Sequence, residues 1–447
     1  MNVVTRIAPS PTGRMHIGTV RTALFNYLFA KKYNGSFLIR IEDTDRERSK
    51  QEWTDAIWED FAWCGIQPDA TYVQSQHLIR HRELLNELVR SDRAYISEEP
   101  AKDDPSRSVA VVRLRNRGSI VSFDDLIRGT VTFDTTELGD FVIARSIDDP
   151  LYHFAVVVDD HDAGVTHVLR AEEHISNTPR QILIIEALGF PRPLYGHMPL
   201  ILAPDRSKLS KRKHAASIDV YRTQGFLPEA LINYLALLGW NPGSDREFFT
   251  LDELAEAFTI ENVQKSGAVF DREKLRWYNR HYLLAKTKEE FDREALAVLR
   301  ESLAGRVVWD ESIGCALVPL IKERISVWDD VRVQAADGEY DFFFTDPILD
   351  TTKIAGKTTP VIAKEHLAHV HEILSQRPHE QHESPEMIKQ HIWTYAEEKG
   401  RGAVLWPFRY ALSGRERSPD PFIIASIIGR EATLRRIHAA CMHLHAL

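Results

Sequence analysis

A strand–helix–strand pattern in the first 41 residues constrains the fold of this chain more than any other feature. Residues 3–8 form an apolar, strand-like run, a turn follows at 9–13, and apolar side chains then recur at helical spacing up to residue 32. Asn34 and Gly35 are a helix stop signal, and residues 36–41 form a second apolar run. These lengths predict a βαβ unit, and hence a parallel sheet with a right-handed crossover.

A second βαβ unit is predicted later in the chain. Its strand is expected at 165–170, and its helix is expected to open with a capping box at 178–181 and to end at Gly189. Between the units, short strand-like runs predict a small α+β insertion; they lie at 109–115, 130–133, 140–145 and 152–158. Strand signals fade after about residue 240. The predicted fold class is therefore α/β: a Rossmann-like parallel-sheet domain with an α+β insertion, followed by all-α C-terminal domains.

The junction between the first strand and its helix is a candidate phosphate site. His16 and Gly18 lie there, and the backbone N–H groups at a helix N-terminus attract anions. Glycine allows a base or ribose to approach the backbone, and an imidazole can donate to a phosphate oxygen as charge develops. In open parallel sheets, ligands bind beyond the carboxyl ends of the strands. That rule selects Ser10, His16, Glu42, Asp43, Asp45, Arg170, Glu172 and Glu173.

A second segment brings two ammonium groups. Lys208 and Lys211 lie in a polar loop at 204–212, after an apolar strand-like run at 197–202. Such a loop can close over a triphosphate, and with His16 it suits attack on an α-phosphate with pyrophosphate as the leaving group. Taken alone, the histidine is more often structural and the lysine-rich loop is usually just solvated. Their order and their positions beside predicted strands together predict an ATP site.

The two segments resemble the signatures of a known family. Residues 16–19 and 208–212 are similar to the "HIGH" and "KMSKS" motifs of class I aminoacyl-tRNA synthetases. The runs Arg6-Ile-Ala-Pro-Ser-Pro-Thr-Gly13 and Arg40-Ile-Glu-Asp-Thr-Asp45 resemble glutamyl-tRNA synthetases of the bacterial type, and the likeness extends over nearly the whole chain.

The resemblance implies a glutamate–tRNA ligase with a two-step reaction. L-Glutamate attacks ATP, which carries Mg²⁺, to give glutamyl-adenylate and pyrophosphate; the 3′ end of tRNA(Glu) then takes the glutamyl group and AMP is released. Activation is expected to wait for bound tRNA, and charging of tRNA(Gln) stays open. No covalent enzyme nucleophile is needed, so catalysis is positioning plus electrostatic stabilisation.

Matching by motif position implies three sets of site residues. The catalytic set is His16, Lys208 and Lys211. The ATP-binding set is Ser10, Thr12, Gly13, His16, Gly18, Thr19, Glu173, Lys208, Leu209, Ser210 and Lys211. The glutamate-binding set is Arg6, Ala8, Ser10, Glu42, Tyr152 and Arg170.

The roles within the glutamate set are also implied by the resemblance. Arg6 and Tyr152 would hold the side-chain carboxylate, Arg170 the α-carboxylate, and Glu42 with Ser10 the α-ammonium. The charge types fit, because each buried charge of glutamate needs a partner of opposite sign. From the residues alone, the segment 40–46 is equally compatible with a surface turn of alternating charge.

The resemblance also divides the chain into domains. The predicted boundaries are 1–95 and 161–240 for the two halves of the Rossmann-like catalytic domain, 96–160 for the acceptor-binding insertion, 241–287 for a helical stem-contact region and 288–447 for an α-helical anticodon-binding domain. Family-like stretches occur at 227–240, 270–277, 405–414 and 427–431. The last part of the chain also holds arginines suited to RNA: Arg401, Arg409, Arg415, Arg417, Arg430, Arg435 and Arg436.

One segment departs from the family pattern. Only residues 96–110 separate Tyr95 from Val111, where most bacterial members carry a longer segment, some with zinc-binding Cys and His. No cysteine lies in it, so we predict no zinc site, no other resident metal, and a reduced acceptor-binding insertion.

Composition agrees with these expectations without deciding them. The three cysteines, Cys64, Cys315 and Cys441, are far apart, which favours a reducing compartment over a disulfide framework. The first strand begins at residue 3 and no apolar run could span a membrane, so we expect a cytoplasmic protein without a membrane partner, and a monomer. A net charge of −9 is unusual for an RNA binder, but a local basic face is sufficient.

Three alternatives remain at this point. A glutaminyl-tRNA synthetase normally opens differently, and the short glutamyl transferase that modifies a tRNA base lacks the C-terminal helical domain. A nucleotidyltransferase acting on a small cofactor would not need two hundred further helical residues. A non-catalytic RNA-binding paralogue is disfavoured because His16, Glu42, Arg170, Lys208 and Lys211 are all present.

Overall fold

The first predicted βαβ unit is present in the computed structural model, which describes residues 2–45, 47–101, 104, 106–209, 216–376 and 384–444. It consists of β1 (Val4–Ile7), α1 (Ile17–Lys32) and β2 (Ser36–Ile41), with β1 and β2 parallel. β3 (Ala70–Val73) follows α2 (Gln51–Trp63) and adds a third parallel strand beside β2. The crossover helix α1 packs on β1 and β2, as the apolar spacing predicts.

The second βαβ unit lies beside the first and is hydrogen-bonded to it. Here β10 (His167–Ala171) leads through a short 3-10 turn η3 (Glu172–Asn177) and α5 (Thr178–Leu188) to the parallel strand β11 (Leu194–Met198). β1 and β10 lie side by side, because the Thr166 N–H donates to the Val4 carbonyl at 3.0 Å. One crossover leads to β2 and the other to β11, so β1 and β10 flank the switch point of the sheet.

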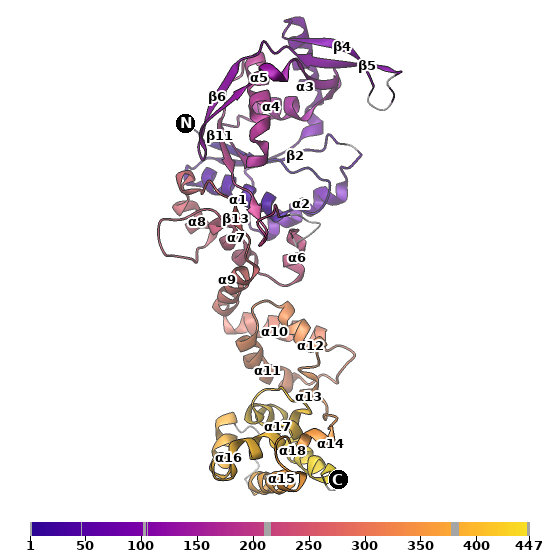
Figure 1. Cartoon of the computed structure of the whole chain (residues 1–447), viewed down its shortest axis with the longest axis vertical. Helices are drawn as coiled ribbons and strands as arrows, with labels where there is room; N and C mark the ends of the chain where they lie inside the picture. Colours follow the sequence, from indigo (N-terminus) through magenta and orange to yellow (C-terminus); the bar gives the residue numbers. More distant parts are fainter. Residues whose placement is uncertain are drawn as a thin grey trace. The chain divides into compact units, whose positions relative to one another are not determined.

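The insertion between the units is an α+β region built around an antiparallel sheet (Figure 1). Its elements are α3 (Leu78–Arg90), β4 (Ala94–Pro100), β5 (Ser108–Leu114), β6 (Ile120–Asp125), β7 (Gly129–Asp134), β8 (Phe141–Ser146), β9 (Asp149–Pro150) and α4 (Tyr152–Asp162). β4, β5, β8 and β9 pair in that order, whereas β6 and β7 extend the main sheet beyond β11. The sequence did not predict β4 or β6.

The prediction of a strand at 152–158 is wrong, because this segment is helix α4. Its run of three valines favours a strand locally. However, Phe154, Val157, Val158 and His161 have the spacing of one helical face. Phe154, Val157 and Val158 are buried in a core shared with α3, α5 and the antiparallel sheet, and this tertiary packing overrides strand propensity.

Two smaller expectations are also corrected. Thr178 does not form a capping box: the N-cap is Asn177, and the Thr178 hydroxyl accepts a hydrogen bond from Arg170 instead. The run at 197–202 is not one strand, since β11 ends at Met198 and β12 (Ile201–Leu202) begins after Pro199. Proline lacks the N–H that would continue the ladder.

The chain divides into two compact units, Met1–Tyr282 and Leu283–Leu447. The rest of the first unit consists of α6 (Ile218–Thr223), α7 (Pro228–Leu237), α8 (Leu251–Ala257), the two-residue strand β13 (Ala268–Val269) and most of α9 (Arg272–Ala285). The second unit consists, in its described residues, of α10 (Lys288–Ser302), α11 (Glu311–Arg324), α12 (Asp329–Ala336), α13 (Asp341–Phe344), α14 (Thr351–Ile354), α15 (Pro360–Ser375), α16 (Pro385–Lys399), α17 (Arg401–Ser413) and α18 (Pro421–His443). Of the helices described, none is both long and apolar enough to cross a membrane.

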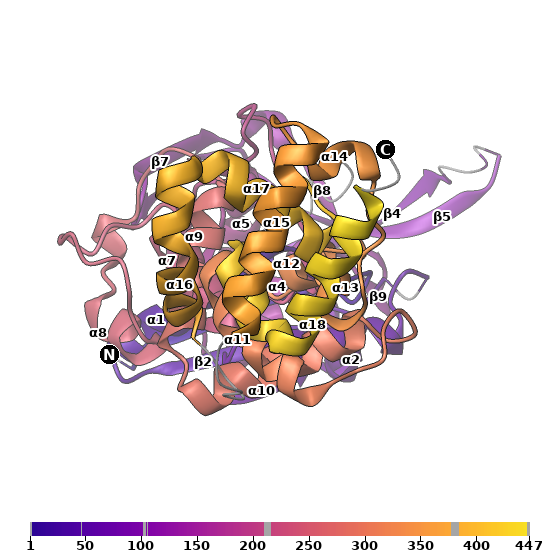
Figure 2. The ribbon, with the colours of Figure 1, turned by 90° about the horizontal axis from the view of Figure 1, so that it is seen from below.

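Within the second unit, α15 to α18 pack against one another (Figure 2). Some arginines expected to face RNA instead hold this bundle together. The Arg436 side chain is buried and donates to Asp346, to the Leu412 carbonyl and to the Thr345 carbonyl. Arg430 donates to two carbonyls at the end of α15. Their guanidinium groups therefore satisfy the backbone, and the sequence pattern alone overstated the surface available to RNA.

The turn from α1 into β2 depends on a glycine with no room for a side chain. A Cβ built on Gly35 would overlap the Val3 carbonyl, which accepts the Ser36 N–H at 2.8 Å. We predict that Gly35→Ala lowers the free energy of unfolding by at least about 3 kcal/mol, because backbone must move in the first βαβ unit. Gly65→Ala is the control: φ there is +70° but no heavy atom lies within 4 Å, so strain alone should cost about 1 kcal/mol. Equal losses in denaturant unfolding would contradict the steric argument.

Candidate active site

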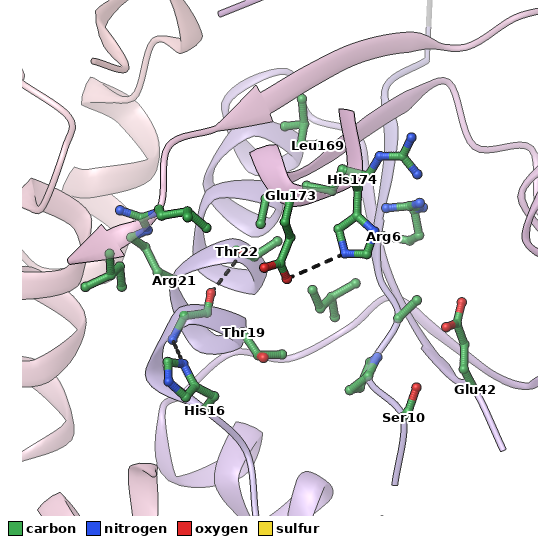
Figure 3. Close-up of a pocket in the computed structure, with 18 of the residues that line it drawn as sticks. Arg6, Ser10, His16, Thr19, Arg21, Thr22, Glu42, Leu169, Glu173 and His174 are labelled. Carbon is green, nitrogen blue, oxygen red and sulfur yellow. Dashed lines mark hydrogen bonds and ion pairs between the residues drawn. The ribbon is translucent and has the colours of Figure 1, made fainter. Parts of the chain in front are cut away.

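A cavity of about 580 Å³ opens at the switch point between β1 and β10. Figure 3 shows side chains converging on it from β1, α1 and the segment after β10. The structure brings most of the predicted site residues to this one cavity: Arg6, Ala8, Ser10, His16, Gly18, Thr19, Glu42, Tyr152, Arg170, Glu173, Lys208 and Leu209. Thr12 and Gly13 lie in the preceding turn and are not among its lining residues. Ser210 and Lys211 lie outside the described residues.

One end of the cavity is built on a buried cluster of charges. The Arg6 Nε donates to the Asp160 carboxylate at 3.1 Å, and the Arg40 Nη1 donates to the same carboxylate at 2.5 Å. The Arg40 Nη2 also contacts Glu42 Oε1 at 3.2 Å. Burial would raise the pKa of Asp160, but Arg6 and Arg40 hold it below its usual value, so the carboxylate is ionised.

Glu42 is the cluster's acidic group at the cavity. It is buried, and burial raises the pKa of its carboxyl group while Arg40 opposes that shift. Tyr152, at the start of α4, lines the same end, and burial raises the pKa of its hydroxyl so that it stays a neutral donor. This end therefore offers cationic, anionic and hydroxyl groups within one small space.

Arg170 is a buried cation that has no carboxylate partner in the described part of the chain. Its side chain comes from β10 and is 5% exposed. The Nε donates to His197 Nε2 at 3.2 Å and one Nη donates to the Thr178 hydroxyl at 2.9 Å. No ion pair of Arg170 is found among the described residues, and burial lowers the pKa of its guanidinium. A buried positive charge in this state favours an anion in the cavity.

The other end of the cavity is the N-terminus of α1. His16 is the N-cap residue, and its Nδ1 accepts the Gly18 N–H at 2.9 Å. In the neutral ring the proton must then be on Nε2, which makes that atom the donor. A Cβ on Gly18 would lie 3.0 Å from the His16 Nδ1, so a larger residue at position 18 would crowd the imidazole ring.

Lys208 is tied to the cavity by Glu173. The backbone turns back after β12, with the Leu209 N–H donating to the Ile201 carbonyl at 3.1 Å. This places the Lys208 ammonium in an ion pair with the Glu173 carboxylate. Figure 3 shows Glu173 pointing into the space between His16 and Glu42. Both side chains are largely exposed, so the pair is weak and screened by solvent.

Sequence reasoning missed several residues of the site. Arg21 and His174 line the cavity, and Asp160 and Arg40 hold Arg6 and Glu42. Burial lowers the pKa of Arg21 to about 10, and its guanidinium donates to the carbonyls of Leu238 and Pro199. The one available signal was a charged residue at an apolar position of a helical pattern, as Arg21 is in α1. No group of three or more metal-ligating side chains is found in the described part of the chain.

Comparison with known proteins agrees with this geometry. The family model described as class I tRNA synthetases for E and Q, catalytic domain, matches residues 2–108 and 96–277. A model described as an anticodon binding domain matches residues 282–441. Together the two matches cover most of the chain and place it among the class I aminoacyl-tRNA synthetases.

The curated relatives and solved structures narrow the class. A glutamate–tRNA ligase of Desulforamulus reducens is 38% identical over 98% of this chain and 100% of its own length. One from Nitratidesulfovibrio vulgaris is 45% identical over 76% of this chain and 80% of its own. The crystal structure of a glutamate tRNA ligase from Elizabethkingia meningosepticum in complex with its amino acid superposes with a TM-score of 0.85 at 30% identity and 99% coverage of both chains. The chain belongs to the glutamate–tRNA ligase family.

The His174 ring gives a pH-dependent test of the site. Burial and the neighbouring Arg170 lower its pKa to about 4 from an unfolded value near 6.5. Between these values the unfolded chain binds a proton that the folded chain does not, so stability falls as pH drops from about 6.5 to 4. We predict that His174→Gln loses less stability than wild type as pH drops through this range, because the slope of its free energy of unfolding against pH is smaller by up to the contribution of one bound proton. Above about pH 7.5 the variant should match wild type. Unfolding midpoints across this range measure it; identical slopes would show that His174 titrates normally.

Proposed function

We propose that the cavity binds L-glutamate at its Arg6–Arg170 end and ATP at its His16–Lys208 end. The observation that carries this proposal is Arg170, a buried guanidinium without a carboxylate partner among the described residues. A bound carboxylate would supply the missing negative charge. Membership in the glutamate–tRNA ligase family supports glutamate as the source of that carboxylate.

The remaining groups of the pocket fit the other charges of glutamate. We assign the α-carboxylate to Arg170, the side-chain carboxylate to Arg6 and Tyr152, and the α-ammonium to Glu42 with Ser10. The Arg6 Nε donates to Asp160, and the other nitrogens of the guanidinium group can donate to a second carboxylate. Ala8 lies after β1 on the same wall and contributes backbone rather than charge.

We assign the ATP end to the α1 N-terminus and the loop after β12. The helix N-terminus and the His16 Nε2 offer donors to phosphate oxygens, and Gly18 and Thr19 lie in the first turn. Lys208 can leave Glu173 for the triphosphate at little cost because their ion pair is exposed. Thr12, Gly13, Leu209, Ser210 and Lys211 belong to this set by motif match. Mg²⁺ arrives with the nucleotide and neutralises phosphate charge when bound.

The product of the cavity is proposed to be glutamyl-adenylate, which transfers its glutamyl group to the 3′ end of tRNA(Glu). Residues 96–160 are assigned to the acceptor end and 288–447 to the anticodon, in agreement with the matched anticodon binding domain. Whether the enzyme also charges tRNA(Gln) stays open. We further propose a monomer in the cytoplasm; the dispersed cysteines, of which Cys64 is buried, are consistent with a reducing compartment.

The pocket assignment predicts tRNA-dependent ATP–pyrophosphate exchange with glutamate and little with glutamine. An amide in place of the side-chain carboxylate would leave a buried cation poorly paired. Arg170→Ala should lower kcat/KM for glutamate by two or more orders of magnitude, roughly the 3 kcal/mol expected for an unpaired buried charge. Arg180→Ala, on the exposed side of α5, is the control. Equal exchange with glutamine, or an inactive control, would reject the assignment.

The second unit is predicted to read the anticodon. Replacing the anticodon of the cognate tRNA should sharply lower charging by the full-length enzyme, because unpaired bases would no longer match their contacts in this unit. Binding should also depend less steeply on salt if phosphate contacts are lost with the misfit. Filter binding and charging at several salt concentrations test both statements. Unchanged charging would favour recognition through the acceptor arm alone.

A further inference from the structure

A buried chain of hydrogen bonds leads from Asp125 to Arg170. The Asp125 Oδ2 lies 2.6 Å from His197 Nδ1, and both side chains are fully buried. On its other side, His197 Nε2 receives the Arg170 Nε at 3.2 Å. Thr178 completes the group, with its hydroxyl 3.1 Å from Nε2 and 2.9 Å from an Arg170 Nη. Of the site residues expected from the sequence, only Arg170 belongs to this series of hydrogen bonds.

The donors and acceptors allow one protonation state. Three backbone N–H groups, those of Ile127, Arg128 and His197, donate to Asp125 Oδ1, which anchors the carboxylate. The carboxylate is ionised, because His197 and these N–H groups outweigh burial and hold its pKa below the usual range. Oδ2 can then only accept, so His197 Nδ1 must carry the proton.

The other ring nitrogen must accept. An Nε2–H would point at the Arg170 Nε–H across 3.2 Å, donor against donor. Burial lowers the pKa of His197, which agrees with a neutral ring. His197 is therefore a neutral imidazole with the proton on Nδ1, aligned between a fixed anion and a fixed cation.

We propose that Asp125, His197 and Thr178 are positioning residues for substrate carboxylate recognition: they orient Arg170 and balance its charge from behind, through a neutral ring. The inference rests on the proposed role of Arg170 toward glutamate. A carboxylate placed directly on Arg170 would neutralise it within the cavity and compete with the substrate. The imidazole instead separates the Asp125 charge from the cavity by one side chain, so Arg170 is held rigidly yet retains its attraction for an anion.

The contrast with Arg6 supports this reading. Arg6 is paired directly with Asp160, and a second arginine, Arg40, compensates that carboxylate. Among the described residues, no arginine side chain bonds to Asp125, and this carboxylate reaches Arg170 only through the ring of His197. The two guanidinium groups of one cavity thus have their charge balanced in two different ways.

The test is Asp125→Asn in the full-length enzyme. The three backbone N–H groups keep the amide oxygen at the Oδ1 position, so the amide N–H faces His197 Nδ1 and drives the ring proton to Nε2, against Arg170. In tRNA-dependent exchange, KM for glutamate should rise roughly 10- to 100-fold, while KM for ATP stays at the wild-type value. Asp124→Asn is the matched control, since it makes the same chemical change one residue away at an exposed carboxylate bonded to Thr130.

Nitrogen-15 NMR of histidine-labelled enzyme measures which ring nitrogen of His197 carries the proton. This tautomer would not change if Asp125 had only a structural role. The His197 signal, assigned by its loss in His197→Gln, should report Nδ1–H in wild type and Nε2–H in Asp125→Asn. A wild-type ring protonated on Nε2 overturns the proposal even if the variant fails to fold. So does a parallel rise of KM for ATP and glutamate, or a switched tautomer with unchanged KM for glutamate. If Arg170→Ala leaves glutamate binding intact, the proposed function itself fails. If Arg170→Ala weakens glutamate binding but Asp125→Asn does not, only the positioning role of Asp125, His197 and Thr178 fails.

Discussion

The buried carboxylate of Asp160 joins helix α4 to the two neighbouring strands that carry Arg6 and Arg40. It lies on α4, and it receives Arg6 from β1 and Arg40 from β2. All three side chains are largely shielded from solvent. Removing one partner would leave a buried charge unpaired and lower the free energy of unfolding by about 3–5 kcal/mol. Because Arg6 and Glu42 belong to the same cluster, these contacts shape the end of the cavity that is proposed to bind glutamate. This rigidity is what a carboxylate site needs in order to bind without reorganisation.

Sequence patterns correctly predicted the parts of the fold that depend on interactions between residues close together in the sequence. Apolar periodicity and the Asn34-Gly35 stop predicted the first βαβ unit. Most of the residues selected by the rule of strand carboxyl ends line the cavity, but Asp43, Asp45 and Glu172 are not among its lining residues. The partners of those residues were not predictable in the same way. Asp160 is 154 positions from Arg6, and no pattern near either residue indicates the pair. Sequence reasoning therefore found most, but not all, of the side chains that face the cavity and did not find those that hold them.

The errors have a common physical origin in tertiary contacts. The three valines of α4 favour a strand until the helix packs against α3 and α5. Thr178 has the sequence of an N-cap, yet its hydroxyl is drawn to Arg170 and His197, where it satisfies a buried cation. In both places a tertiary interaction outweighs a local preference of about 1 kcal/mol.

The two ends of the cavity differ in how firmly their charges are held, and the difference matches their proposed tasks. At the amino-acid end the charged groups are buried and hydrogen-bonded, so a wrong side chain meets fixed donors that it cannot satisfy. At the nucleotide end Lys208 and Glu173 are exposed, and such a pair contributes about 0–1 kcal/mol. A triphosphate offers Lys208 far more charge than one carboxylate does, so the lysine can exchange partners as pyrophosphate charge develops. The proposed function thus assigns selectivity to the rigid end of the cavity and movement during the reaction to the exposed end.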